Sequence, residues 1–548
     1  MGTSLVFVFL LAATAADAGA QQEAARIFVN PAEMPLQGKL DELVFARLKQ
    51  AGIEPAAVCS DAVFVRRAYL DVIGTLPTVA EARQFLLDQA PDKRRILIDR
   101  LLEREEFADY WAMKWSDVLR VKAEFPINLW PNAAQAYHRW IRISIRDNLP
   151  YDQFVRELLT ANGSNFRVGQ VNFYRAVQSK TPEGIAQAVA LTFMGARADK
   201  WPKERLSGMA AFFSQINFKS TTEWKEEILS FDSELAVDSA AGKQPPAVFP
   251  DGTSAKLSPD RDPRQVFADW LLASDNPWFA QNIVNRVWCW LLGRGIIHEP
   301  DDVRPDNPPS NPELLAYLER ELVAARYDLK QIYRLILNSK TYQLSSVSQS
   351  DKPAAAALFA SYPLRRLEAE VLIDALNQIT GTTEQYSSPI PEPFTFIPEG
   401  QRSIALPDGS ITSSFLEQFG RPSRDTGLES ERSNRPTADQ RLHLLNSSHI
   451  QRKIENSPAL QTLFQSAAGP PAGRFNKARK SAKAVSPEGA KQPNEIAAVL
   501  YLTILSRFPT ETELQTLAEY VASASSRREA GVDLAWALIN SAEFLYRH

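Results

Sequence analysis

Histidine and cysteine are scarce in this sequence of 548 residues. No two of its histidines stand three or four positions apart, and neither cysteine belongs to a CxxC or CxxCH pattern. A histidine or thiolate metal site could be assembled only from distant segments, so we expect no metal and no other cofactor. The residues concerned are His138, His298, His443, His449, His548, Cys59 and Cys289.

The sequence also lacks the short motifs that mark common enzyme classes. It contains no GxSxG nucleophile elbow, no GxxxxGK[ST] phosphate loop, no GxGxxG turn and no HExxH zinc motif. Positive charge is not in excess either, because 61 Lys and Arg residues stand against 65 Asp and Glu residues, a formal net charge of −4. Without a basic surplus there is no global field to hold a phosphate backbone, so we expect no nucleic-acid partner.

Long hydrophobic runs are missing beyond the N-terminal residues MGTSLVFVFLLAATAADAGA. The apolar run there extends from Leu5 to about Ala16, which is too short to span a bilayer, and small residues follow at Ala18 and Ala20. No Lys or Arg precedes the run. The pattern predicts a signal peptide over residues 1–20 and an exported protein that is periplasmic, cell-surface or extracellular. We expect no transmembrane segment in the mature chain.

Apolar residues are plentiful, by contrast. Hydrophobic residues make up 45% of the chain, which has 28 Phe and 11 Trp, and they recur at three- and four-residue spacing in segment after segment. This length and periodicity predict a mainly α-helical globular protein of roughly two to four compact units.

Several helix boundaries are also visible in the sequence. Gly195 stands where a left-handed residue would close the helix that Thr181 and Pro182 open. The spacing of a capping box, in which two side chains satisfy each other's free backbone N–H groups, occurs at three places. These are Thr78 with Glu81, Ser310 with Glu313, and Thr510 with Glu513.

Irregular segments interrupt the helical pattern. Between about residues 229 and 259, prolines and a PDG turn signal replace the periodicity. We therefore predict two helical domains, at 39–231 and 260–546, joined by a short irregular or β-containing connection with a linker at 232–259. The second domain carries insertions near 384–436, which could hold short strands, and near 467–493, which has the composition of a surface loop.

The densest group of polar residues is NRVWCWLLGRGIIHEPDDVRPDN, in which a Trp-rich helix ends at Gly293 or Gly295 and an acidic loop follows. Carboxylates of this loop could bind a hard cation such as calcium, or arginines could neutralise them in a network that fastens the loop to the helix. We favour the network, because the loop lacks the DxDxDG order. The candidate ligand-binding residues are Asn285, Arg286, Asp301, Asp302 and Arg304, and we expect Asp301 or Asp302 to contact Arg286 or Arg304.

Other conspicuous residues have structural interpretations. Cys289 lies among large apolar residues, which favours a buried free thiol over a disulfide with Cys59, although export would permit the bridge. We expect Arg66, Arg67 and Asp71 to fasten a helix end to its neighbours. We expect a helical stripe of aromatic side chains to fill the core, and it consists of Phe107, Tyr110, Trp111 and Trp115.

Long stretches of the chain resemble a known pair of domains. FVRRAYLDVIGTLPTVAEARQFLLD, YWAMKWSDVLR, NLPYDQFVRELL and MAAFF resemble the planctomycete cytochrome-c-associated domain of unknown function, second type. DPRQVFADWLLASDNPWFAQNIVNRVWCWLLGRGI, DDVRPDNPPSNPELL, LILNSKTYQLSS, RRLEAEVLIDAL and LLNS resemble its usual C-terminal companion, the planctomycete surface-associated domain of unknown function. Together they cover most of the chain from about 39 to 546.

The resemblance implies an exported protein whose partner is an envelope or periplasmic protein, such as a cytochrome-containing or co-exported one. It also shows what this member lacks. Relatives carry CxxCH and a further His-Pro after FLG, whereas FMGARA runs directly into DKW here. The relatives' Cys-x-Cys-Glu-Arg stretch after FGRP is also altered, because Leu428 and Ser430 stand at the cysteine positions. The resemblance therefore implies that neither haem nor a thiol-bound metal is held at these places.

Two functions remain open at this point. The first is an exported helical scaffold or binding protein that kept the fold of its relatives but lost their thiol site. The alternative is a hydrolase or lyase that acts on envelope or extracellular polymers through acidic residues such as Asp301 and Asp302. Paired carboxylates can act as acid and base only if their environments separate their pKa values. We favour the first function, and no catalytic residue is assigned.

Overall fold

The computed structural model describes residues 27–30, 34–36, 38–232, 234, 246–258, 260–468, 493–524 and 526–548. The predicted signal peptide at 1–20 lies outside these residues, as do most of the 467–493 insertion and the middle of the 232–259 linker. Helices account for 53% of the chain, and the sheets have only two or three strands, which confirms the mainly α fold.

The first part of the chain contributes nine long helices and three short 3-10 turns to the described structure. They are α2 (Lys39–Gln50), α3 (Asp61–Val72), α4 (Val79–Leu87), α5 (Lys93–Leu102), α6 (Glu105–Val118), α7 (Pro131–Arg146), α8 (Tyr151–Thr160), η1 (Gly169–Tyr174), α9 (Pro182–Met194), η2 (Ala198–Lys200), α10 (Lys203–Ala210) and η3 (Ala211–Phe213).

The second part is also helical, but long irregular segments separate its helices. The elements are α12 (Pro263–Leu271), α13 (Phe279–Leu292), α14 (Pro312–Ala324), α15 (Leu329–Asn338), α16 (Ala369–Thr380), η5 (Ser403–Ala405), α17 (Ser414–Gln418), η6 (Glu429–Glu431), α18 (Ala438–Asn446), α19 (Ser448–Glu455), α20 (Pro458–Ala468), α21 (Pro493–Leu505), α22 (Glu511–Ser523), α23 (Arg527–Ile539) and α24 (Ala542–Leu545).

Two small antiparallel sheets complete the described fold. One has the strand order β1-β3-β2, formed by β1 (Gly163–Ser164), β2 (Ile216–Ser220) and β3 (Glu227–Phe231), and its β2–β3 hairpin directly precedes the predicted linker. The other pairs β4 (Arg365–Arg366) with β5 (Tyr546–Arg547). In the 384–436 insertion, where short strands were expected, the described pairing is a single isolated bridge between Ser387 and Thr412.

Most of the predicted helix boundaries are confirmed. Capping boxes start α4 at Thr78 and α22 at Thr510, and Gly195 ends α9 in the left-handed conformation with φ 62°. The prediction for α14 is wrong by one residue. Its N-cap is Asn311, whose side chain accepts from the Leu314 N–H at 3.1 Å, because Pro312 occupies the first helical position. Ser310 instead donates its hydroxyl to the carbonyl of Ile296 at 3.1 Å.

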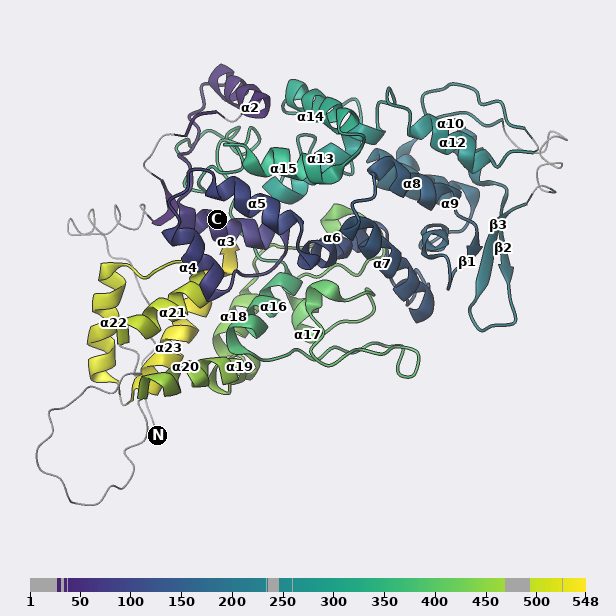
Figure 1. Ribbon diagram of the computed structural model, residues 1–548. Coiled ribbons are helices and arrows are strands. Elements are labelled where there is room, and N and C mark those ends of the chain that lie inside the picture. The colour runs from purple at the N-terminus through teal and green to yellow at the C-terminus, as the bar shows by residue number, and fades with distance from the viewer. Residues whose placement is uncertain are drawn as a thin grey trace, which may run out of the picture.

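Helices from the two matched halves of the sequence lie side by side. Figure 1 shows the purple helices α2 to α5 next to the teal helices α13 to α15 and the yellow helices α21 to α23. The pairs α2 with α14, α5 with α15, α4 with α21, and α9 with α13 are in contact, and buried residues from both halves join one hydrophobic cluster. The boundaries 39–231 and 260–546 stay a prediction, but the helices on either side of the linker share a core.

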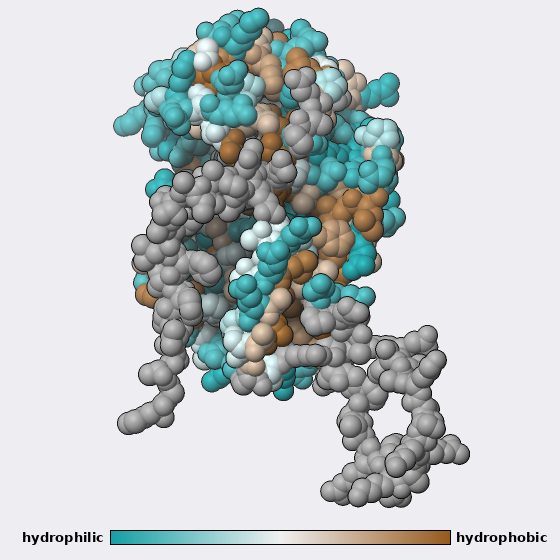
Figure 2. All heavy atoms as spheres, turned by 90° about the vertical axis from the view of Figure 1, so that its left-hand side faces the viewer, coloured by the Kyte–Doolittle hydropathy of each residue, from teal (hydrophilic) through white to brown (hydrophobic). Residues whose placement is uncertain are grey.

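The aromatic stripe of α6 lies in that core, as expected. Phe107, Tyr110, Trp111 and Trp115 are all buried. The Trp111 and Trp115 rings lie 5.4 and 5.7 Å from the ring of Trp290 in α13. Aromatic pairs at such separations stabilise a core beyond the area they bury. The outside of the molecule is mixed, and Figure 2 shows hydrophobic side chains in separate patches among hydrophilic ones on one face.

Candidate functional site

Helix α13 positions the first of the candidate residues. Almost all of its residues are buried, and it ends at Gly293, which has φ 69°. Asn285 faces the loop that follows, and its side-chain amide both donates to the carbonyl of Ile297 at 3.0 Å and accepts from the N–H of Ile297 at 2.9 Å. These two hydrogen bonds satisfy the buried amide and fix where the acidic loop begins.

A carboxylate of the acidic loop, residues 299–306, pairs with a side chain of the same helix. Arg286 donates from Nη2 to Oδ1 of Asp301 at 2.7 Å, and both side chains are only 1% exposed. The backbone N–H of Glu429 donates to the other oxygen of Asp301 at 2.6 Å. Burial lowers the pKa of Arg286, but the charges of Asp301 and Glu429 outweigh this effect and raise that pKa above its ordinary value. The predicted contact between Asp301 and Arg286 is confirmed.

The remaining two candidate residues lie at the surface. Arg304 donates to Asp302 at 3.1 Å and to Asp306 at 2.8 Å, and its side chain is 51% exposed. The predicted pairing of Asp302 with Arg304 is therefore also confirmed. The structure thus divides the five candidates into a buried group, Asn285, Arg286 and Asp301, and a pair nearer the surface, in which Arg304 is exposed and Asp302 is half-buried.

The connection between α9 and α10 packs against this loop. The N–H of Val303 donates to the carbonyl of Gly195 at 2.8 Å, and Arg197 donates to Glu299 at 3.2 Å. A Cβ at Gly195 would lie 2.7 Å from Oδ1 of Asn282 and 2.8 Å from the carbonyl oxygen of Pro300, so the approach requires glycine. Gly195 thus closes α9 as predicted, and a short connection leads from it to α10.

Trp201 anchors the far end of this connection. Its ring is partly buried and packs on the hydrophobic core, and the guanidinium of Arg205 in α10 lies 4.0 Å from the ring centroid. Phe212 and Phe213, which follow α10, are almost fully buried. The two ends of the segment from Gly195 to Phe213 are therefore packed in the core, whereas most of residues 199–204 are exposed.

A charged segment of the 384–436 insertion completes the network, and its residues were not among the candidates predicted from the sequence. Arg432 donates to Asp117 at 2.6 Å and to Glu370 at 2.7 Å, and Arg424 donates to Asp117 at 2.9 Å. Arg421 lies 3.4 Å from Glu370. Burial raises the pKa of Glu370, but the two arginines outweigh it and lower this pKa to about 2. The sequence signal for this role was the number of arginines in an otherwise irregular segment.

The two places where relatives carry thiols both touch the acidic loop. Gly195 and Arg197, at the first place, contact the acidic loop. Glu429, which lies between Leu428 and Ser430 at the second place, also contacts it. Over the part of the chain that the structure describes, no group of three or more His, Cys, Asp or Glu side chains could hold a metal ion.

A second buried network ties α3 to the last residues of the sequence. Asp71 accepts from the hydroxyls of Tyr342 and Tyr362 at 2.9 and 2.7 Å and from Arg547 at 3.0 Å. Arg66 and Arg67 donate to backbone carbonyls, including those of residues 504, 544, 342 and 344. The expectation that these three charged residues fasten a helix end to its neighbours is confirmed.

Both cysteines are buried free thiols. Burial raises the pKa of Cys289 far above its ordinary value, so the thiolate that attacks or ligates is suppressed there. The expectation of a buried free thiol at Cys289 is therefore confirmed.

These features define a helical protein in which buried arginine–carboxylate pairs hold irregular segments against a core shared by both halves of the chain. Residues 39–217 match the family model PSCyt2, a protein of unknown function (DUF1549), and residues 263–521 match PSD1, a protein of unknown function (DUF1553). The chain therefore belongs to the proteins in which a PSCyt2 domain is followed by a PSD1 domain. No curated protein and no solved structure matches it. None of the described helices has the length and apolar character needed to cross a membrane.

Proposed function

We propose that this protein is an exported helical scaffold or binding protein of the bacterial envelope, without a haem or thiol-bound metal centre. The observation that carries the proposal is the pairing of Asp301. Its two oxygens accept from Arg286 and from the backbone N–H of Glu429, and its side chain is 1% exposed. A carboxylate in this position stabilises the packing of three segments and has no free face for a substrate.

The alternative, a hydrolase or lyase on envelope or extracellular polymers, would need carboxylates that reach a bound chain. Asp302 is the more accessible of the two acidic residues, but Arg304 neutralises it at 3.1 Å and also binds Asp306. Because Asp302 and Asp306 already share a cationic partner, neither carboxylate is left free to act on a bound polymer. The geometry therefore favours the scaffold at these residues.

The partner we propose is a co-exported envelope or periplasmic protein, such as a cytochrome-containing one. The support is the sequence resemblance, together with the apolar run at Leu5–Ala16 that predicts export. A shared helical core gives such a protein rigid surfaces on which a partner can dock.

A turnover assay tests this proposal against the alternative. The purified protein would be incubated with isolated envelope polysaccharide and peptidoglycan, and released reducing ends and peptides would be measured. We expect no release above that from the heat-inactivated protein. Release that Asp302→Asn abolishes, while the variant keeps the wild-type melting temperature, would establish the enzyme and refute the scaffold.

A further inference from the structure

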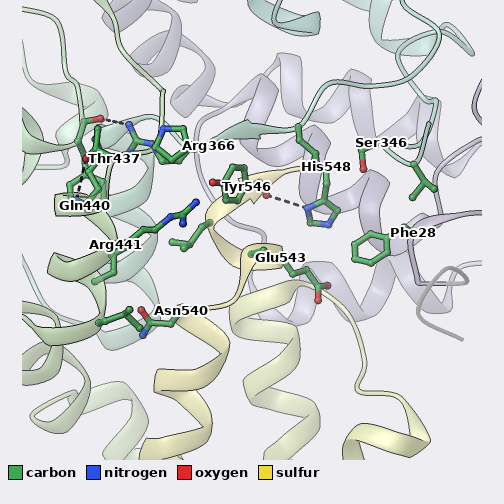
Figure 3. A pocket seen from close by; sticks show the side chains of 18 residues that line it. Phe28, Ser346, Arg366, Thr437, Gln440, Arg441, Asn540, Glu543, Tyr546 and His548 are labelled. Atoms are coloured by element: carbon green, nitrogen blue, oxygen red, sulfur yellow. Dashed lines mark hydrogen bonds between the residues drawn. The ribbon is translucent and has the colours of Figure 1, made fainter. Parts of the chain in front are cut away.

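A pocket of about 640 Å³ opens among segments that are far apart in sequence. Figure 3 shows its walls: α18 with Gln440 and Arg441, the end of the chain from Asn540 to His548, and Phe28 at the far rim. Ligand pockets of proteins typically measure about 300–1,000 Å³, so this volume suits a small organic molecule.

The lining is largely apolar, and part of it faces solvent. Leu364 is 63% exposed, Leu445 is 47% exposed and Val347 is 46% exposed, whereas Phe419 and Leu444 form the buried floor. Exposed leucines gathered around a concave surface have lost the burial that would stabilise them, and a bound alkyl chain would restore it.

Arg441 supplies a free positive charge inside this apolar lining. Its side chain extends from α18 toward Tyr546 in the middle of the pocket (Figure 3). The side chain of Arg441 is exposed to solvent and makes no hydrogen bond or ion pair with any residue that the structure describes. The carboxylate that lines the pocket, Glu543, does not neutralise it, because both oxygens of Glu543 accept from Arg507, at 2.6 and 2.9 Å.

A second guanidinium reinforces the charge. Arg366 lines the same pocket and is buried, and it donates to the carbonyls of Phe419 and Ser433 at 2.6 and 3.1 Å. Its hydrogen-bond partners are neutral backbone oxygens, but the carboxylates of Glu368 and Glu370 lie near enough to offset part of its charge. An apolar pocket that contains one free cation, Arg441, and a second, partly offset one, Arg366, is complementary to an apolar molecule with an anionic end.

We infer that this pocket binds a free fatty acid, whose alkyl chain lies on the wall formed by Leu364, Leu444 and Leu445 and whose carboxylate pairs with Arg441. The inference deepens the proposed binding function and rests on it. The two can fail separately, because the turnover assay does not depend on this pocket and the ligand titration does not depend on the acidic loop.

The test uses three probes with the same alkyl chain and different head groups: dodecanoate, dodecanol and dodecyltrimethylammonium. Each would be titrated into the full-length protein by calorimetry below its critical micelle concentration. We expect dodecanoate to bind at least about fivefold more tightly than dodecanol, and the cationic probe to bind most weakly. Equal affinity for the three probes, or no binding of dodecanoate, would overturn the inference.

Two pairs of variants locate the site. Arg441→Gln should weaken dodecanoate about fivefold and leave dodecanol unchanged, whereas Arg452→Gln, an exposed arginine on α19 outside the pocket, should change neither. Leu445→Gln should weaken both probes, whereas Leu442→Gln, on the same helix and 55% exposed but outside the lining, should not. All four positions are exposed, so the fold should persist. Equal effects within either pair would contradict this site.

Discussion

Arginine is prominent among the buried charged residues that the structure describes. The largest side chains below 2% exposure include Arg66, Arg67, Arg264, Arg286 and Arg424. A guanidinium keeps its charge in the interior, so each one must find carboxylates or carbonyl oxygens there. These residues satisfy that requirement at helix ends and in irregular segments, which is where free backbone carbonyls are found.

The first prediction concerns Gly195. Its φ of 62° and the oxygens of Asn282 and Pro300 leave no space for a side chain, so Gly195→Ala should lower the free energy of unfolding by about 2 kcal/mol or more. Gly252→Ala is the control, because Gly252 also has a positive φ, 91°, but nothing lies within 4 Å of the added Cβ. Urea unfolding of both variants provides the comparison. Equal losses would show that Gly195 is not packed against the acidic loop.

The second prediction concerns pH. Burial, together with the charges of Arg424 and Arg142, lowers the pKa of His138 to about 3. Unfolding restores a pKa of about 6.5, so between these values the unfolded chain binds the extra proton and stability falls as the pH is lowered. We expect this residue to contribute a slope of up to about 1.4 kcal/mol per pH unit below pH 6.

Chemical denaturation at several pH values measures this slope. His138→Gln should flatten the dependence, and His298→Gln should flatten it less, because His298 lies at the surface. An unchanged slope in His138→Gln would mean that other groups govern the acid sensitivity.

At the scale of elements, the connection between α9 and α10 defines what this member of the family can bind. The stretch at 193–213 contains neither histidine nor cysteine, and its oxygen donors Asp199 and Glu204 are flanked by four cationic side chains. Positive neighbours oppose a bound cation. We therefore predict no Soret absorbance and no stoichiometric iron or zinc in the purified protein. One equivalent of a transition metal that survives dialysis against a chelator would refute this.

The elements differ in how far their sequence predicts them. The caps at Thr78 and Thr510 were predictable because their partners lie three residues away. The start of α14 was displaced by one residue, because Ser310 and Asn311 are both good caps. Pro312 at the first helical position and the tertiary contact of Ser310 with Ile296 together select Asn311. The irregular insertion had no periodicity to show which side chains point inward, so its pairing with α6 and α16 could not be predicted.

The candidate site shows the same limit. The charge pattern predicted that Asp301 or Asp302 meets an arginine, and both do. Which of the two is buried depends on the direction of side chains in a loop, and that is set by Glu429, more than a hundred residues away. Long-range partners of this kind leave no local signal in the sequence.

At the scale of the whole molecule, the two matched domains do not have separate cores. Helix α2 packs on α14 and α5 packs on α15, with Leu40, Val44 and Leu101 fully buried. Residues 39–231 expressed alone would expose these apolar faces. We predict that this fragment melts without a cooperative transition and binds a hydrophobic dye, whereas the full-length protein melts cooperatively. A cooperative melt of the fragment near the full-length temperature would show that the halves are independent.

The most direct test of this account compares the stability of two variants in neighbouring residues, Asp301→Asn and Asp302→Asn. Asp301 joins α13, the acidic loop and η6 as a buried charge, so its loss leaves Arg286 without its closest carboxylate. The account predicts that Asp301→Asn lowers the free energy of unfolding in urea by about 3 kcal/mol. Asp302→Asn should change it by less than about 0.5 kcal/mol. If Asp301→Asn were as stable as the wild type, the acidic loop would not be a structural junction and the scaffold proposal would lose its main support.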